Sequence, residues 1–172
     1  MKKKIYSLLS VFVVVMAMVA PVSAGGAVKL SSVSFRLGSL IADGTLTGLG
    51  RTDVSVIIEA SGIPAITCIN HGRNLVPGQS YPKVSASGSQ VLDGDSPVRK
   101  NGKSPFGVET VDPETIPWDE AGCPNANWTG HIDFIFWTDA SISVYSESTQ
   151  ALLLQKEYVC TTTLTSVSCT PK

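Results

Sequence analysis

Apolar and polar residues alternate with a period of two through much of this chain, and this alternation constrains the fold more than any other feature. It is clearest in four segments, at 33–37, 54–60, 131–136 and 141–144. Successive side chains of a strand point to opposite faces of the sheet, so this period is typical of a strand with one buried face. In the third segment it places Phe134 and Phe136 on the buried face, and His131 and Trp137 on the other. The pattern predicts an all-β fold.

Frequent turn signals divide the chain into short expected strands. Asp-Gly, Ser-Gly, Pro-Gly or Asn-Gly pairs occur at 43–44, 61–62, 77–78, 93–94 and 101–102, and such pairs favour turns and tight hairpins. No segment shows the apolar stripe of a long helix. We therefore expect an antiparallel two-sheet sandwich, immunoglobulin-like in architecture, with about seven to nine strands. A partly open barrel is the alternative.

The first 24 residues have the three parts of a secretory signal peptide. Three lysines follow Met1, an apolar run extends from about Leu8 to Val19, and Val22 and Ala24 suit a cleavage site. The run is shorter than the roughly 20 residues that span a membrane. We expect a signal peptide over 1–24, a single β-sandwich domain over 25–172, and no transmembrane segment after cleavage. The mature protein is then secreted, in the extracellular space or the cell envelope, whereas an uncleaved membrane anchor is the alternative.

The charge balance excludes two classes of partner. The chain has 13 Lys and Arg against 14 Asp and Glu, and three of the lysines belong to the predicted signal peptide. The mature protein therefore carries a net charge of about −4. Nucleic acids and anionic membrane surfaces select basic patches, so we expect neither as a partner.

All four cysteines lie after the predicted cleavage site, at Cys68, Cys123, Cys160 and Cys169. An even number of cysteines in an exported chain predicts disulfides, and four cysteines allow three pairings. We favour a local bond between Cys160 and Cys169 across a C-terminal hairpin, which leaves Cys68–Cys123 as a long bridge. A zinc site with the two histidines is the alternative, but the sequence has no C-x-x-C pair. We assign no metal ligands.

Two segments lack a strand pattern and are candidate binding loops, because loops on a rigid scaffold often carry function. The first, residues 71–79, contains His71 and Arg73, and the second, residues 111–127, contains Trp118. A Cys68–Cys123 bond would hold the two loops beside each other. Trp118 and Trp128 flank Cys123, and such a pair can stack on a sugar ring or anchor a protein partner. The alternative is that both tryptophans cap the core over the disulfide.

Several phrases of the sequence form a recognisable pattern. They are Gly44–Gly50, Thr52–Val54, Thr67–Asn70, Pro77–Gln79, Trp118–Asn125 and Asn127–Thr129. Together these phrases resemble a recurring pattern in an uncharacterised family of small secreted bacterial β-sandwich proteins, and they cover about half of the mature chain. The resemblance implies secretion and one shared domain, and it implies no activity. The tail with Cys160 and Cys169 lies outside the pattern.

No motif indicates a catalytic site. The paired acids of a glycosidase must face each other across a cleft, whereas Asp112, Glu114, Asp119 and Glu120 lie close together beside Pro and Gly, where acids are usually turn residues. The sequence has no G-x-S-x-G for a triad. We expect no cofactor. Structural calcium is the alternative, because Asp93-Gly94-Asp95 has a spacing found in calcium sites, although the full loop is absent.

These patterns favour an exported, non-enzymatic protein that serves as a binding or structural module. Its expected partner is a polysaccharide or another envelope protein. The alternatives are a secreted hydrolase that acts on an envelope polymer, and a protease inhibitor that presents residues 71–79.

Overall fold

Ten strands and no helix make up the part of the chain that the structure, a computed structural model, describes, which is residues 27–98 and 102–172. The predicted signal peptide, residues 1–24, lies outside these residues. The strands are β1 (Lys29–Arg36), β2 (Ile41–Thr47), β3 (Val54–Asn70), β4 (Leu75–Pro77), β5 (Val84–Leu92), β6 (Lys103–Glu109), β7 (Thr115–Ile116), β8 (Trp128–Ser146), β9 (Leu152–Thr162) and β10 (Val167–Pro171). Within the described ranges, no helix is long and apolar enough to cross a membrane.

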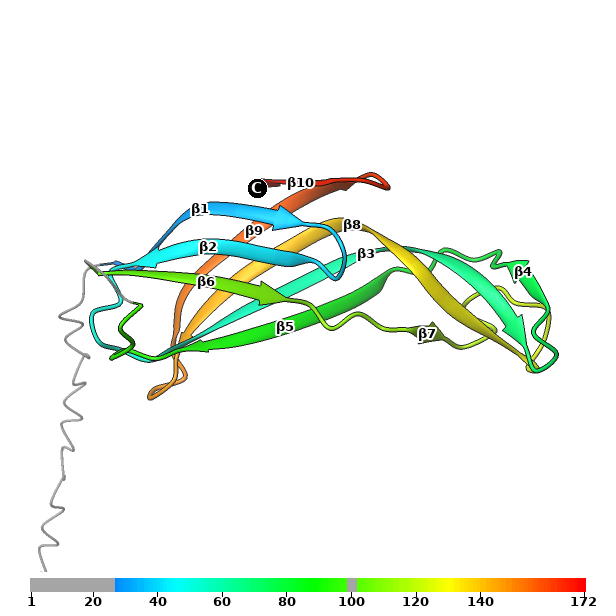
Figure 1. Cartoon of the computed structure of the whole chain (residues 1–172), viewed down its shortest axis with the longest axis horizontal. Helices are drawn as coiled ribbons and strands as arrows, with labels where there is room; N and C mark the ends of the chain where they lie inside the picture. The colour runs from blue at the N-terminus through cyan, green and yellow to red at the C-terminus, as the bar shows by residue number, and fades with distance from the viewer. Residues whose placement is uncertain (1–26, 99–101) are drawn as a thin grey trace, which may run out of the picture.

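The strands form two antiparallel sheets (Figure 1). The smaller sheet has the order β1-β2-β6. The larger sheet runs β10-β9-β8-β3-β4, with β5 beside the first half of β3 and β7 beside the start of β8. The predicted all-β fold with two antiparallel sheets is therefore confirmed. The larger sheet is a half-barrel, so the finer expectation of an immunoglobulin-like sandwich stays a prediction.

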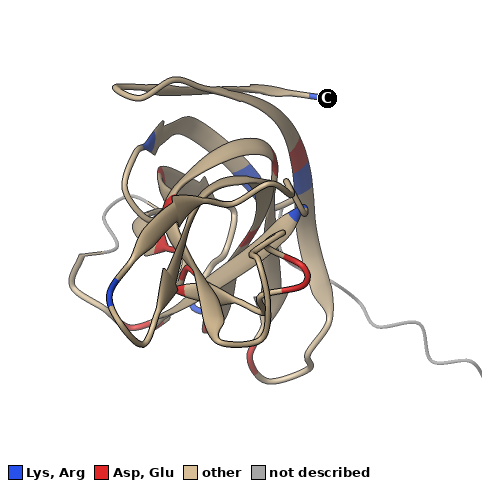
Figure 2. Ribbon diagram, turned by 90° about the vertical axis from the view of Figure 1, so that its right-hand side faces the viewer, with Lys and Arg blue, Asp and Glu red and all other residues tan. Residues whose placement is uncertain are grey.

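The half-barrel and the smaller sheet meet along two lines. On one side, Val111 N–H donates to the Ser87 carbonyl at 2.8 Å, and Gly107 N–H donates to the Gln90 side chain at 3.1 Å. On the other side, β10 lies beside β1 (Figure 1). Viewed along the long axis, the strands curl around an interior, and basic residues lie scattered among acidic ones (Figure 2).

β3 and β8 run the length of the molecule as an antiparallel pair, from Val54 opposite Ser146 to Asn70 opposite Trp128 (Figure 1). The turns predicted at Asp43-Gly44 and Ser61-Gly62 are wrong, because β2 and β3 continue through them. Gly62 is instead a point of close approach. A Cβ atom there would lie 2.5 Å from the carbonyl oxygen of Phe136, so only glycine lets the two backbones pair at this position.

The facing of β8 also differs from the prediction. The register with β3 shifts between Ser61 and Gly62 and between Ala65 and Ile66, which leaves Thr138 and Asp133 as extra residues on β8. Each bulge inverts the alternation of side chains. Trp137 is consequently buried, whereas Phe136 lies opposite the exposed Ile63 on the outer face. The predicted inward direction of Phe134 and Phe136 and the outward direction of Trp137 are wrong.

Buried apolar residues form two separate clusters. The larger cluster lies between the half-barrel and the smaller sheet and includes Leu46, Ile58 and Trp137. Phe35 of β1 packs edge-on against Tyr158 of β9, with ring centroids 5.0 Å apart, and so joins the two sheets. The smaller cluster lies at the far end of β3 and contains Cys68 and Cys123 together with three apolar residues, Ile66, Ile116 and Ala121.

Thr110 links the end of β6 to the turn between β1 and β2. Its hydroxyl accepts a hydrogen bond from Leu40 N–H at 2.9 Å and donates one to the Asp112 carboxylate at 2.6 Å. Thr110 is 2% exposed, so water cannot replace these bonds. We expect Thr110→Val, which keeps the side-chain shape, to lower the free energy of unfolding by about 1–3 kcal/mol, because it leaves the buried Leu40 N–H unpaired. Urea denaturation followed by tryptophan fluorescence measures this change.

Thr165→Val is the matched control. Thr165 is exposed in the turn between β9 and β10, so its substitution should change stability by no more than about 0.5 kcal/mol. Equal effects of the two substitutions would contradict the role of Thr110.

Candidate functional site

Both predicted disulfides are present in the structure, Cys68–Cys123 with a sequence separation of 55 and Cys160–Cys169 with a separation of 9. Within the described ranges no cysteine is free. Two disulfides indicate an oxidising, extracellular compartment. The Cys68–Cys123 bond joins the end of β3 to the segment between β7 and β8, as expected. We call this region the stapled end.

The stapled end brings the predicted binding residues to one end of the molecule. Trp118 is 39% exposed and lies in a tight turn in which its carbonyl accepts Cys123 N–H at 2.8 Å. Trp128 is half-buried against the smaller cluster, so it covers the disulfide region. His71 and Arg73 are exposed in the β3–β4 turn. None of these four residues lines the cavities described below.

The segment 71–79 is part of a hairpin rather than a free loop. β4 pairs with the end of β3, with Leu75 opposite Ile69. Gly78 N–H donates to the Ile66 carbonyl at 2.9 Å. Only the tip at 71–74 projects from this hairpin.

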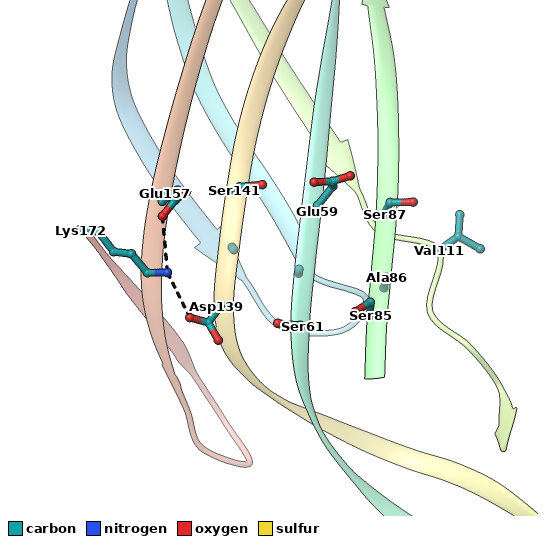
Figure 3. A pocket seen from close by; sticks show the side chains of 12 residues that line it. Glu59, Ser61, Ser85, Ala86, Ser87, Val111, Asp139, Ser141, Glu157 and Lys172 are labelled. Carbon is teal, nitrogen blue, oxygen red and sulfur yellow. Dashed lines mark ion pairs between the residues drawn. The ribbon is translucent and has the colours of Figure 1, made fainter. Parts of the chain in front are cut away.

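A cavity of about 610 Å³ lies elsewhere, on the outer face of the half-barrel. Four neighbouring strands each contribute one residue to a row across its floor. The pairing sets this row as Ser87 of β5, Glu59 of β3, Ser141 of β8 and Glu157 of β9. Figure 3 shows their side chains projecting from the same face. Because strands lie about 4.8 Å apart, the row spans about 14 Å.

A second row lies two residues along, with Ser85, Ser61 and Asp139 in register. The serines of both rows have short side chains, so the surface between the longer acidic side chains is hollow. We call this cavity the serine groove. Lys172 closes its β9 side, with Nζ 3.3 Å from Asp139 and 3.6 Å from Glu157 (Figure 3). Lys83 also contacts Asp139, at 2.9 Å.

Asp139, at the β9 side of the groove, is held in its ionised state. A hydrogen bond from Lys83, with further bonds from Thr138 and Lys172, lowers the pKa of Asp139 to about 2. A general acid needs a raised pKa, so Asp139 cannot serve as a proton donor near neutral pH. The serine groove thus suits binding through hydrogen bonds and charge.

An apolar strip continues the same outer face beyond the serine groove. It consists of Ile63, Phe134 and Phe136, and we call it the aromatic strip. Ile63 is 42% exposed and lies opposite Phe136. The rings of Phe134 and Phe136 meet edge to face with centroids 4.9 Å apart. The outer face of β3 and β8 therefore presents a polar hollow followed by aromatic rings.

A smaller cavity of about 490 Å³ lies beside the start of β8. Its lining includes Asp112, Glu114, His131 and Asp133. Burial raises the pKa of Asp112, although hydrogen bonds from Thr110 and Ser39 act in the opposite direction. Asp119 and Glu120, the other acids considered from the sequence, do not line this cavity and are exposed.

The structure offers no support for a cation at Asp93-Gly94-Asp95. The Asp93 carboxylate accepts a hydrogen bond from Asp95 N–H at 2.8 Å, and Gly94 N–H donates to the Asp53 carboxylate. In residues 27–98 and 102–172, no group of three His, Cys, Asp or Glu side chains is arranged to hold a metal ion.

Neither the serine groove nor the aromatic strip is predictable from the local sequence pattern. Outward serines on strands are an ordinary pattern, and the phase of Phe134 and Phe136 depends on two bulges. The only available signal was the repeated outward Ser in β5 and β8. The chain matches no protein-family model, and it has no similar curated protein or solved structure.

Proposed function

We propose that this protein is an exported, non-enzymatic binding module that holds a polysaccharide of the cell envelope or extracellular space in the serine groove. The observation that carries this proposal is a hollow of about 610 Å³, lined by serine hydroxyls and carboxylates, that adjoins an aromatic strip on one sheet face. Its volume lies within the usual range of ligand sites, about 300–1,000 Å³.

The chemistry of the lining suits sugars. A serine hydroxyl both donates and accepts hydrogen bonds, and a carboxylate accepts them, so the groove can satisfy the hydroxyls of a sugar in either sense. An aromatic ring can pack against the apolar face of a sugar, and aromatic side chains supply large contact areas. An open groove on a rigid sheet also admits a polymer that continues beyond the site.

Filling the serine groove should abolish polysaccharide binding. Ser141 lies between Glu59 and Glu157 in the first row, so the ring of Ser141→Tyr would occupy the hollow. We expect retention of the purified, disulfide-bonded protein on insoluble polysaccharides and isolated cell envelopes to fall at least tenfold. A sedimentation assay measures the bound fraction.

Ser168→Tyr on the exposed outer strand β10 is the matched control and should leave retention unchanged. Trp118→Ala tests the stapled end. Retention that survives Ser141→Tyr and is lost with Trp118→Ala would place the binding site at the stapled end instead. Failure to bind any polysaccharide would refute the proposal.

A hydrolase is the second candidate, because the smaller cavity brings Asp112, Glu114 and His131 together and burial raises the pKa of Asp112. Perturbed carboxyl groups in cavities are candidate general acids. Against this, the Thr110 bond gives Asp112 a structural role. Release of reducing sugars by the protein, lost in Asp112→Asn while Thr110→Val retains it, would favour the hydrolase.

We further infer that the chain belongs with the small secreted bacterial β-sandwich proteins whose sequence pattern it resembles. The supporting observations are the Cys68–Cys123 bond, which joins two of the phrases of that pattern, and the exposed position of Trp118 within one of these two phrases.

A further inference from the structure

The β9 side of the serine groove already holds an ammonium group. Lys172 Nζ lies between Asp139 and Glu157, at 3.3 and 3.6 Å, and its backbone N–H donates to the Glu157 carbonyl at 3.0 Å. Lys83, which directly precedes β5, donates a hydrogen bond to the same Asp139 carboxylate at 2.9 Å. These two lysines neutralise the carboxylates of Asp139 and Glu157.

Glu59 at the middle of the groove differs from these two acids. Its side chain is exposed and, within the described ranges, no hydrogen bond or ion pair engages its carboxylate. Ser87 and Ser141 flank it in the same row. The centre of the hollow therefore combines an unpaired negative charge with hydroxyl groups on both sides.

We propose that the serine groove selects polysaccharides whose sugar units carry free primary amines, with Glu59 as the acceptor of the ammonium group. This inference rests on the proposed function. The amine forms a charge-assisted hydrogen bond, about twice as strong as a neutral one, while Ser87 and Ser141 bond to neighbouring sugar hydroxyls. Asp139 and Glu157 form a second possible acceptor for an amine. The ammonium group of Lys172 already occupies this position and therefore competes with the ligand.

The charge count supports this choice over neutral or acidic polymers. Three carboxylates, those of Glu59, Asp139 and Glu157, line the groove, and the ammonium groups of Lys83 and Lys172 contact only the carboxylates of Asp139 and Glu157. The groove is therefore one positive charge short of balance, and a ligand amine supplies that charge. An acidic polysaccharide would place like charges opposite Glu59.

Three β-1,4-linked hexasaccharides with the same backbone test the proposal. They are the hexamers of glucosamine, N-acetylglucosamine and glucose, which differ only in an amine, an amide or a hydroxyl at one ring position. Calorimetric titration of the full-length, disulfide-bonded protein at pH 5.5, which keeps the sugar amines protonated, should show at least tenfold tighter binding of the glucosamine hexamer. Added salt should reduce this preference.

Two substitutions should change the preference in opposite directions. Glu59→Gln should bring the ratio of the glucosamine to glucose affinities close to one. Lys172→Gln should raise the glucosamine affinity severalfold, because it frees Glu157 and one carboxylate oxygen of Asp139 to accept an amine, whereas Lys83 keeps its bond to the other oxygen. Glu120→Gln and Lys29→Gln make the same charge changes at exposed positions outside the groove and should leave the ratio unchanged.

The outcomes separate this inference from the proposed function. Equal affinities for the three hexamers, each abolished by Ser141→Tyr, would overturn amine selection and leave polysaccharide binding intact. A glucosamine preference unaffected by Glu59→Gln and Lys172→Gln would overturn the assigned acceptors. Absence of binding to all three hexamers and to insoluble polysaccharides would refute both proposals.

Discussion

Removing the Cys68–Cys123 disulfide by Cys68→Ala and Cys123→Ala should lower the free energy of unfolding by about 4 kcal/mol. The bond closes a loop with a separation of 55 residues, and loop closure of this length restricts the unfolded chain by about that amount. The loss is a large share of a typical stability of about 5–15 kcal/mol. Guanidinium denaturation under non-reducing conditions measures it.

The C-terminal disulfide provides the internal control. Cys160–Cys169 closes a loop with a separation of only 9 residues, so its removal should cost about 2.7 kcal/mol. A larger loss from the shorter loop would contradict loop closure as the source of stability. Cys68 and Cys123 lie away from the serine groove, so the folded double variant should still bind the same polysaccharide.

Trp137→Ala should lower the free energy of unfolding by about 3–5 kcal/mol, the usual cost of removing a fully buried large aromatic side chain. Trp137 is 1% exposed and belongs to the larger cluster. Its indole N–H is buried with no hydrogen-bond acceptor among the described residues. Trp137→Phe should therefore cost much less than Trp137→Ala, because it keeps ring contacts and removes the unpaired donor. Thermal and urea denaturation of the variants measure both effects.

Phe136→Ala is the matched comparison, one residue earlier and on the opposite face. Phe136 is half-buried on the outer face, so its truncation should cost less than half as much as Trp137→Ala. The alternation in the sequence, which places Phe136 inside and Trp137 outside, would instead predict the larger loss of stability for Phe136→Ala. A cost below about 1 kcal/mol for Trp137→Ala would show that Trp137 lies outside the core.

Period-two patterning predicted the first part of β3, from Val54 to Ala60, because no bulge changes the direction of its side chains. Every inward position from Val54 to Cys68 is buried. The same reasoning failed on β8, where two extra residues reverse the facing between Asp133 and Thr138. A bulge depends on which strand lies alongside, and this information is not local in the sequence. The turn predicted at Ser61-Gly62 was wrong for the same reason. Gly62 allows the backbone of β8 to approach closely and does not form a turn.

The disulfide pairing could be predicted because spacing and compartment leave few alternatives. The serine groove could not be predicted in this way. Its first row takes residues 59, 87, 141 and 157 from four strands, and only the pairing order brings them side by side. Individually, each is an ordinary polar residue on the solvent side of a strand. By contrast, Trp118, His71 and Arg73 were selected from local loop composition alone, and their role in binding stays a prediction.

The β3–β8 pair also sets the order in which the chain can fold. Val54 pairs with Ser146 and Asn70 with Trp128, so the partners lie between 58 and 92 residues apart (from 70 to 128 and from 54 to 146). Folds dominated by such distant pairings form in milliseconds to seconds, because chain entropy is lost before the contacts are gained. A ribosome or translocation channel releases β3 long before β8. During this interval β3 cannot pair with β8. This 17-residue strand, with an unbroken apolar face, is consequently the segment that most needs protection from aggregation until synthesis is nearly complete.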